Sequence, residues 1–76
     1  MFCMRVTYLP IGRSAVLDCS SLDLEESARI LARGYHNRLM RLQPEQYMTP
    51  TSARKLIVAA SALGTAQGGD FRLEKL

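Results

Sequence analysis

Few side chains in this sequence are suited to catalysis. His36 is the only histidine, so it alone has an ordinary pKa suited to proton transfer near neutrality. It stands beside Asn37 on the polar side of an expected helix, and no serine or cysteine stands at a spacing that would give an activated nucleophile. The carboxylates of Asp23, Glu25 and Glu26 are already explained by a helix start. The sequence therefore predicts a binding protein and not an enzyme.

The two cysteines, Cys3 and Cys19, do not form a C-x-x-C pair. Together with one histidine they are too few for a zinc site built from histidine and cysteine ligands. A disulfide between them is geometrically conceivable if both stand at the open end of one hairpin, but two reduced thiols are the favoured interpretation. The glycines late in the chain lack the spacing of a nucleotide-binding loop. No metal and no cofactor are expected.

Basic side chains follow acidic ones along the chain, which has a formal net charge of +3. The acidic group is Asp18, Asp23, Glu25 and Glu26, and the basic group is Arg29, Arg33, Arg38, Arg41, Arg54 and Lys55. A basic segment favours an acidic protein partner or nucleic acid, although a solvated helix face is the commoner explanation. The scattered aromatic residues offer no platform for stacking bases, so nucleic acid is the less favoured partner.

Two short strands are predicted at residues 4–9 and 14–19, and they would position the turn residues between them. The faces predicted to be apolar carry Met4, Val6 and Tyr8 in the first strand and Ala15, Leu17 and Cys19 in the second. Pro10 removes a backbone donor and marks the end of the first strand. Gly12 can adopt the positive φ that a tight reversal needs. A β-hairpin is therefore expected.

A first helix is predicted to begin near Asp23. This side chain can cap the helix while Glu26 reaches back to it, as in a capping box. The apolar stripe continues to Leu42, and Pro44 ends the helix because the residue before a proline is pushed out of helical geometry. Gly34 is expected to be a weak position inside this helix.

A second helix is predicted from Thr49, which caps it, with Pro50 at its first position. It extends to about Leu63 and ends at Gly64. This helix is apolar on nearly every side, which predicts that one hairpin and one helix cannot cover it within a single copy. A homodimer is therefore expected, and its interface is predicted at Leu56, Ile57, Ala60 and Leu63.

At 76 residues the chain is expected to form one small domain over residues 1–76. Its predicted class is α+β, with β-β-α-α order. Residues 64–76 are expected to be a flexible tail, in which residues 71–76 form either a short strand or a disordered end. No signal peptide is apparent, and the longest apolar stretch, at residues 56–66, is shorter than the roughly 18 residues that span a membrane. No membrane contact is expected, and the predicted location is cytoplasmic.

Several of these features occur in a recognisable order along most of the chain. They are residues 6–11, Gly12-Arg13-Ser14, residues 16–19, residues 26–42, Thr49-Pro50-Thr51 and residues 56–60. This order resembles the head of the ZapA family of bacterial cell-division proteins, which has a hairpin with a Gly-Arg-Ser or similar turn, followed by two helices. The order and spacing carry the resemblance, because no single motif is specific to the family.

The resemblance implies a non-enzymatic homodimer that contacts filaments of the tubulin-like division GTPase FtsZ through a basic surface. Arg13 in the hairpin turn is the clearest expected contact, with Arg38 and Arg41 as further candidates. The long coiled coil of the family has no counterpart after Gly64, so the expected assembly stops at a dimer. The alternative is a small basic nucleic-acid-binding or regulatory protein.

Overall fold

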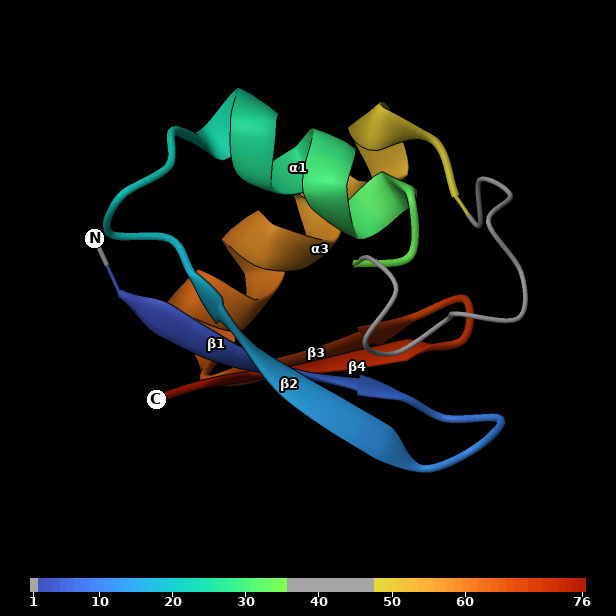
Figure 1. The fold of residues 1–76 in the computed structure, drawn as a ribbon. Coiled ribbons are helices and arrows are strands. Elements are labelled where there is room, and N and C mark those ends of the chain that lie inside the picture. Colours follow the sequence, from blue (N-terminus) through green and yellow to red (C-terminus); the bar gives the residue numbers. More distant parts are fainter. Residues whose placement is uncertain (1, 36–47) are drawn as a thin grey trace.

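The computed structural model describes residues 2–35 and 48–76. Along the chain these residues form β1 (Cys3–Tyr8), β2 (Arg13–Asp18), α1 (Leu24–Ala32), α3 (Pro50–Leu63), β3 (Thr65–Gly68) and β4 (Phe71–Lys75). The four strands make one antiparallel sheet in the order β2-β1-β4-β3. Both helices cover the same face of this sheet, so the fold has two layers (Figure 1). The α+β class predicted from the sequence is confirmed.

The expected β-β-α-α order is incomplete and the flexible tail at residues 64–76 is wrong, because this segment forms β3 and β4. The short strand that the sequence offered as one alternative for residues 71–76 is confirmed, and it is β4. β4 lies in the centre of the sheet, between β1 and β3. Its apolar side chains Phe71 and Leu73 alternate along the strand and are fully buried. The link between the two strands is the dipeptide Gly69-Asp70, with Gly69 at φ 56°. This is a typical two-residue hairpin turn. The sequence therefore contained a signal for the second hairpin, which the prediction missed.

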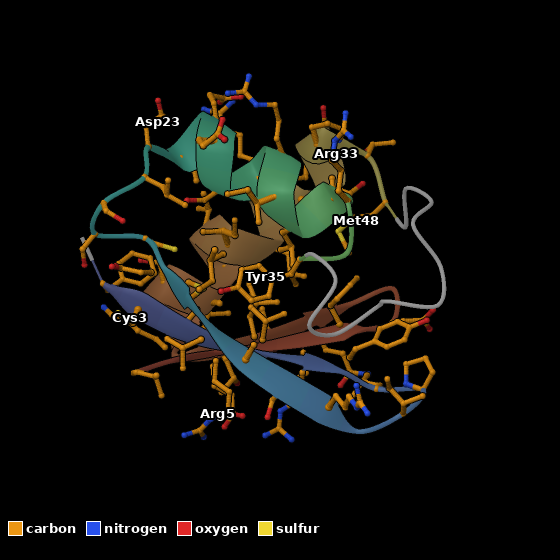
Figure 2. All side chains as sticks on the ribbon, viewed as in Figure 1. Cys3, Arg5, Asp23, Arg33, Tyr35 and Met48 are labelled. Atoms are coloured by element: carbon orange, nitrogen blue, oxygen red, sulfur yellow. The ribbon has the colours of Figure 1, made fainter. Side chains whose placement is uncertain are left out.

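The first hairpin follows the prediction. β1 pairs with β2 in a register that places Val6 opposite Ala15 and Tyr8 opposite Arg13. The predicted apolar faces point toward the helices: Met4, Val6, Tyr8, Leu17 and Cys19 are buried, and Ala15 is half-buried. The opposite face of the sheet is polar, and Figure 2 shows Arg5 projecting from it, away from the helices.

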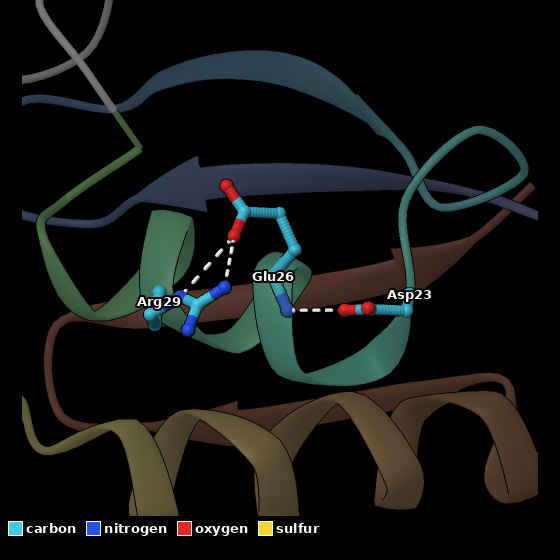
Figure 3. A network of polar contacts seen from close by, with 3 residues as sticks. All are labelled: Asp23, Glu26 and Arg29. Carbon is cyan, nitrogen blue, oxygen red and sulfur yellow. Dashed lines mark hydrogen bonds and ion pairs between the residues drawn. The ribbon is translucent and has the colours of Figure 1, made fainter.

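Helix α1 begins where the sequence predicts. Asp23 caps it by accepting a hydrogen bond from the Glu26 backbone N–H at 2.6 Å. The Glu26 carboxylate does not reach back to Asp23; it binds the guanidinium of Arg29 (Figure 3). Glu25 forms an ion pair with Arg54 of α3 at 3.4 Å.

The end of α1 differs from the prediction. The Tyr35 N–H donates to the Ile30 carbonyl and the Gly34 N–H donates to the Leu31 carbonyl, both at 2.9 Å. Gly34 has φ 84°, in the left-handed region. This combination is the Schellman motif, in which a glycine just past the last turn satisfies the free carbonyls. Gly34 is thus the end of the helix and not a weak position inside it. The rest of the predicted helix, with His36, Arg38, Arg41 and Pro44, lies outside the described residues.

Helix α3 has the predicted bounds. The Thr49 hydroxyl accepts from the Ser52 N–H at 3.1 Å, Pro50 occupies the first position, and Gly64 ends the helix at φ 91°. Leu56, Ile57 and Ala60 are at most 7% exposed, because α3 packs between α1 and the β3–β4 hairpin. One copy of the chain therefore covers these three side chains, and the premise that they need a second copy is wrong. Leu63 is different, with 80% of its surface exposed.

Neither of the two helices described here is long and apolar enough to cross a membrane. Both cysteines are free: Cys19 is buried in the core, and Cys3 lies half-buried. Alternation along β1 places the Cys3 side chain with Arg5 on the polar face of the sheet. The two thiols therefore lie on opposite faces of the sheet, which explains why they are not bonded.

Candidate functional site

The β1–β2 loop presents exposed apolar side chains beside an exposed cation. Residues 9–12 form the loop, and Arg13 begins β2 directly after it. The Gly12 N–H donates to the Leu9 carbonyl at 3.3 Å, and Gly12 has φ 66°, which a glycine adopts without strain. The predicted glycine turn is confirmed. We call residues 9–13 the hairpin tip.

The hairpin tip projects large side chains into solvent. Leu9 is 40% exposed and Ile11 is 56% exposed, and the side chain of Arg13 beside them is exposed too. Arg13 forms no ion pair within residues 2–35 and 48–76. Four other arginines of the same ranges do form ion pairs: Arg5 and Arg72 with Glu74, Arg29 with Glu26, and Arg54 with Glu25. The guanidinium of Arg13 is therefore available to an external carboxylate.

The β3–β4 hairpin contacts the hairpin tip and supports it. The Leu9 N–H donates to the carbonyl of Asp70, in the β3–β4 turn, at 2.8 Å. Directly beneath it, the rings of Tyr8 and Phe71 lie 5.4 Å apart between centroids, with a tilt of 42°. Such tilted aromatic pairs add stability beyond the area that they bury. The side chains of the hairpin tip therefore stand on a rigid base.

The opposite end of the sheet carries another exposed apolar pair. Leu63 ends α3, and the Lys75 N–H donates to the carbonyl of the next residue, Gly64, at 2.8 Å. The Leu76 N–H donates to the Cys3 carbonyl at 2.9 Å. These bonds bring Leu63 and Leu76, which is 56% exposed, to the same end of the molecule. We call these two leucines the leucine end.

The predicted site residues that lie within residues 2–35 and 48–76 divide into three groups. Arg13 is at the hairpin tip, where its exposure suits binding. Leu63 is at the leucine end, far from Arg13 along the strands, whereas Leu56, Ile57 and Ala60 belong to the core. Arg38 and Arg41 lie outside the described residues.

Sequence reasoning missed two residues of the hairpin tip, Leu9 and Ile11. The signal was present, because apolar residues on both sides of Pro10 in a short turn have no core to enter. Among the described residues no group of three or more histidine, cysteine or acidic side chains could hold a metal ion.

Comparisons with protein-family models, with curated proteins and with solved structures found no match.

Proposed function

We propose that this protein is a non-enzymatic binding module that docks through its hairpin tip onto an acidic surface of another protein. The observation that carries the proposal is the exposure of Leu9, Ile11 and Arg13 on one rigid turn. Arginine is one of the residues enriched at the energetically dominant positions of protein interfaces, and the side chains around such a position contribute by excluding water. The resemblance to the ZapA family suggests the FtsZ filament as the partner, which also implies a cytoplasmic location.

The physical basis of this docking is electrostatic attraction combined with preorganisation. A partner carboxylate gains a charge-assisted hydrogen bond from Arg13 while Leu9 and Ile11 exclude water around it. Because the turn is held by Gly12 and by the bond from Leu9 to Asp70, little loop entropy is lost on binding. Complementary charge also increases the association rate, and this effect weakens with added salt.

We infer a homodimer as the second part of the proposal, now through the leucine end and not through the core of α3. Leu63 and Leu76 are the exposed apolar residues there. In a dimer with two-fold symmetry, the two leucines of one copy would pack against the same two leucines of the other copy. The hairpin tips lie at the far end of each sheet, so they stay free in such a dimer. Two free tips would link two sites on an acidic filament, and effective concentration would raise the overall affinity.

The direct test is co-sedimentation of the purified protein with polymerised FtsZ. We expect Arg13→Glu to weaken binding about tenfold or more, because it replaces an attraction by a repulsion worth more than about 1.4 kcal/mol. The matched control is Lys55→Glu, which makes the same charge change at an exposed position of α3. Sizing both variants checks that their association state is unchanged.

Equal binding by Arg13→Glu and Lys55→Glu would contradict the role of the hairpin tip. Failure of the unaltered protein to sediment with the filament would exclude FtsZ as the partner. Steep salt dependence of binding to DNA, without filament binding, would favour the nucleic-acid alternative.

A further inference from the structure

A separate groove lies on the helix layer, between the start of α1 and the second half of α3. It has a volume of about 340 Å³, and its lining includes Phe2, Cys19, Leu24, Ser27, Val58 and Ala62. We propose that this groove binds a small, uncharged, mainly apolar molecule that carries one hydrogen-bonding group. Nothing in the hairpin tip or the leucine end is needed for this binding.

The lining of the groove sets the charge and the size of the ligand. None of the lining side chains is ionised, so a charged ligand would lose its hydration and find no counter-charge among them. A volume of about 340 Å³ is near the lower limit for sites that hold small organic molecules. The ligand is therefore neutral and comparable in size with a single substituted ring.

Ser27 is the reason why the ligand should carry a hydrogen-bonding group. Its side chain is 0% exposed, and its hydroxyl has no nitrogen or oxygen partner among the described residues. The thiol of Cys19 is the group beside it, and a thiol is only a weak hydrogen-bonding partner, whose pKa burial raises here. A buried hydroxyl with so weak a partner is costly, because the water that it lost on folding is not fully replaced. A ligand hydroxyl or carbonyl that reaches Ser27 would remove this cost.

The mouth of the groove is formed by apolar side chains. Phe2 and Leu24 line it, and each is half-buried and packs against the core. The Phe2 ring has the Lys75 ammonium 5.3 Å from its centroid, which holds the ring at the edge of the site. Ser27 lies deeper, in the buried part of α1.

The groove is also distinct from the proposed dimer contact. Leu63 follows Leu56 by two helical turns, and Leu56 packs toward Gly68 of β3. Val58 and Ala62 project from the other flank of α3, next to α1. The groove and the leucine end therefore use different side chains of α3.

The test uses three probes of equal ring size: benzyl alcohol, toluene and benzoate. Each is titrated into the isotope-labelled full chain, and the amide shifts are followed by NMR. We expect saturable shifts at Ser27, Val58 and Ala62 with benzyl alcohol and none with benzoate. Ser27→Ala should reduce the preference for benzyl alcohol over toluene about fivefold, because it removes one hydrogen bond.

A second pair of variants tests the location. Ala62→Leu adds bulk within the groove at an exposed position and should abolish the saturable shifts. Thr51→Leu adds a leucine at an exposed position of α3 outside the groove and should leave them unchanged. The proposal is overturned if the shifts do not saturate, or if Ser27→Ala keeps the same preference. It is also overturned if the groove resonances move with protein concentration alone, since a second copy would then be the occupant.

Discussion

At the scale of single residues, the two cysteines show how position in the fold controls reactivity. Cys3 and Cys19 belong to neighbouring segments of one hairpin, yet the first is half-buried and the second is 1% exposed. The Cys3 thiol lies 3.7 Å from the Asp18 carboxylate, to which it donates. Burial raises the pKa of Cys19 above its ordinary value, because a buried thiolate loses its hydration.

We therefore expect Cys3 to be alkylated by iodoacetamide well before Cys19 in the folded protein. The reagent reacts with the thiolate, Cys19 is less accessible, and burial raises the pKa of Cys19. Mass spectrometry of the two cysteine-containing peptides over time measures the ratio of rates. In urea the two rates should converge. Faster modification of Cys19 under native conditions would contradict its buried position.

The same pKa shift predicts a pH dependence of stability. A pKa raised by folding means that the folded state holds its proton more tightly than the unfolded chain does. This contribution is complete below the ordinary thiol pKa of 9.0 and is lost as the pH rises through and above that value. Cys19→Ala should remove this part of the alkaline loss in unfolding free energy, whereas Cys3→Ala should retain it.

At the scale of elements, the strand β4 contributes most to joining the two halves of the chain. It pairs with β1 on one side and with β3 on the other, so the first and last strands form the centre of the sheet. Phe71 and Leu73 are 0% exposed and belong to the core that α1 and α3 cover. Loss of β4 from the sheet would therefore remove core surface on which the helices pack.

We expect Phe71→Ala to reduce the unfolding free energy by about 3–5 kcal/mol, which is the usual cost of a buried phenylalanine. The loss includes the ring contact with Tyr8. Urea denaturation followed by circular dichroism measures it. Arg72→Ala, at an exposed position of the same strand, is the control and should cost well under 1 kcal/mol. A similar midpoint for both variants would show that β4 is not a core strand.

At the scale of the whole molecule, the layout separates three surfaces. The hairpin tip lies at one end of the sheet, the leucine end lies at the other, and the apolar groove lies on the helix layer. A small domain buries a limited share of its surface, so an association that covers exposed leucines would add stability. This layout permits self-association and partner binding at the same time.

Light scattering at several concentrations tests the self-association. We expect a concentration-dependent dimer, and we expect Leu63→Ser to shift the equilibrium toward the monomer by removing an exposed apolar side chain from the contact. Val58→Ser makes a comparable change on the other flank of α3, at a side chain that is 51% exposed. This control should dimerise like the unaltered protein. A monomer at all concentrations would exclude the dimer and, with it, the two-site model of filament binding.

The sequence by itself determined the local features of this protein. The two-residue alternation fixed which faces of β1 and β2 are buried, and the caps at Asp23 and Thr49 fixed where α1 and α3 begin. Gly12 and Arg13 likewise indicated the hairpin turn and its cation. These features depend on residues within a few positions of one another, which is why local patterns predict them.

Only the tertiary structure decided how distant segments combine. Pairing of β1 with β4 joins the first strand to the last, and no local pattern specifies that partner. This pairing supplies the extra sheet surface that covers Leu56, Ile57 and Ala60 within one copy, so an apolar helix did not require a second chain. The hairpin tip also depends on it, because the Asp70 carbonyl that holds Leu9 comes from the other hairpin.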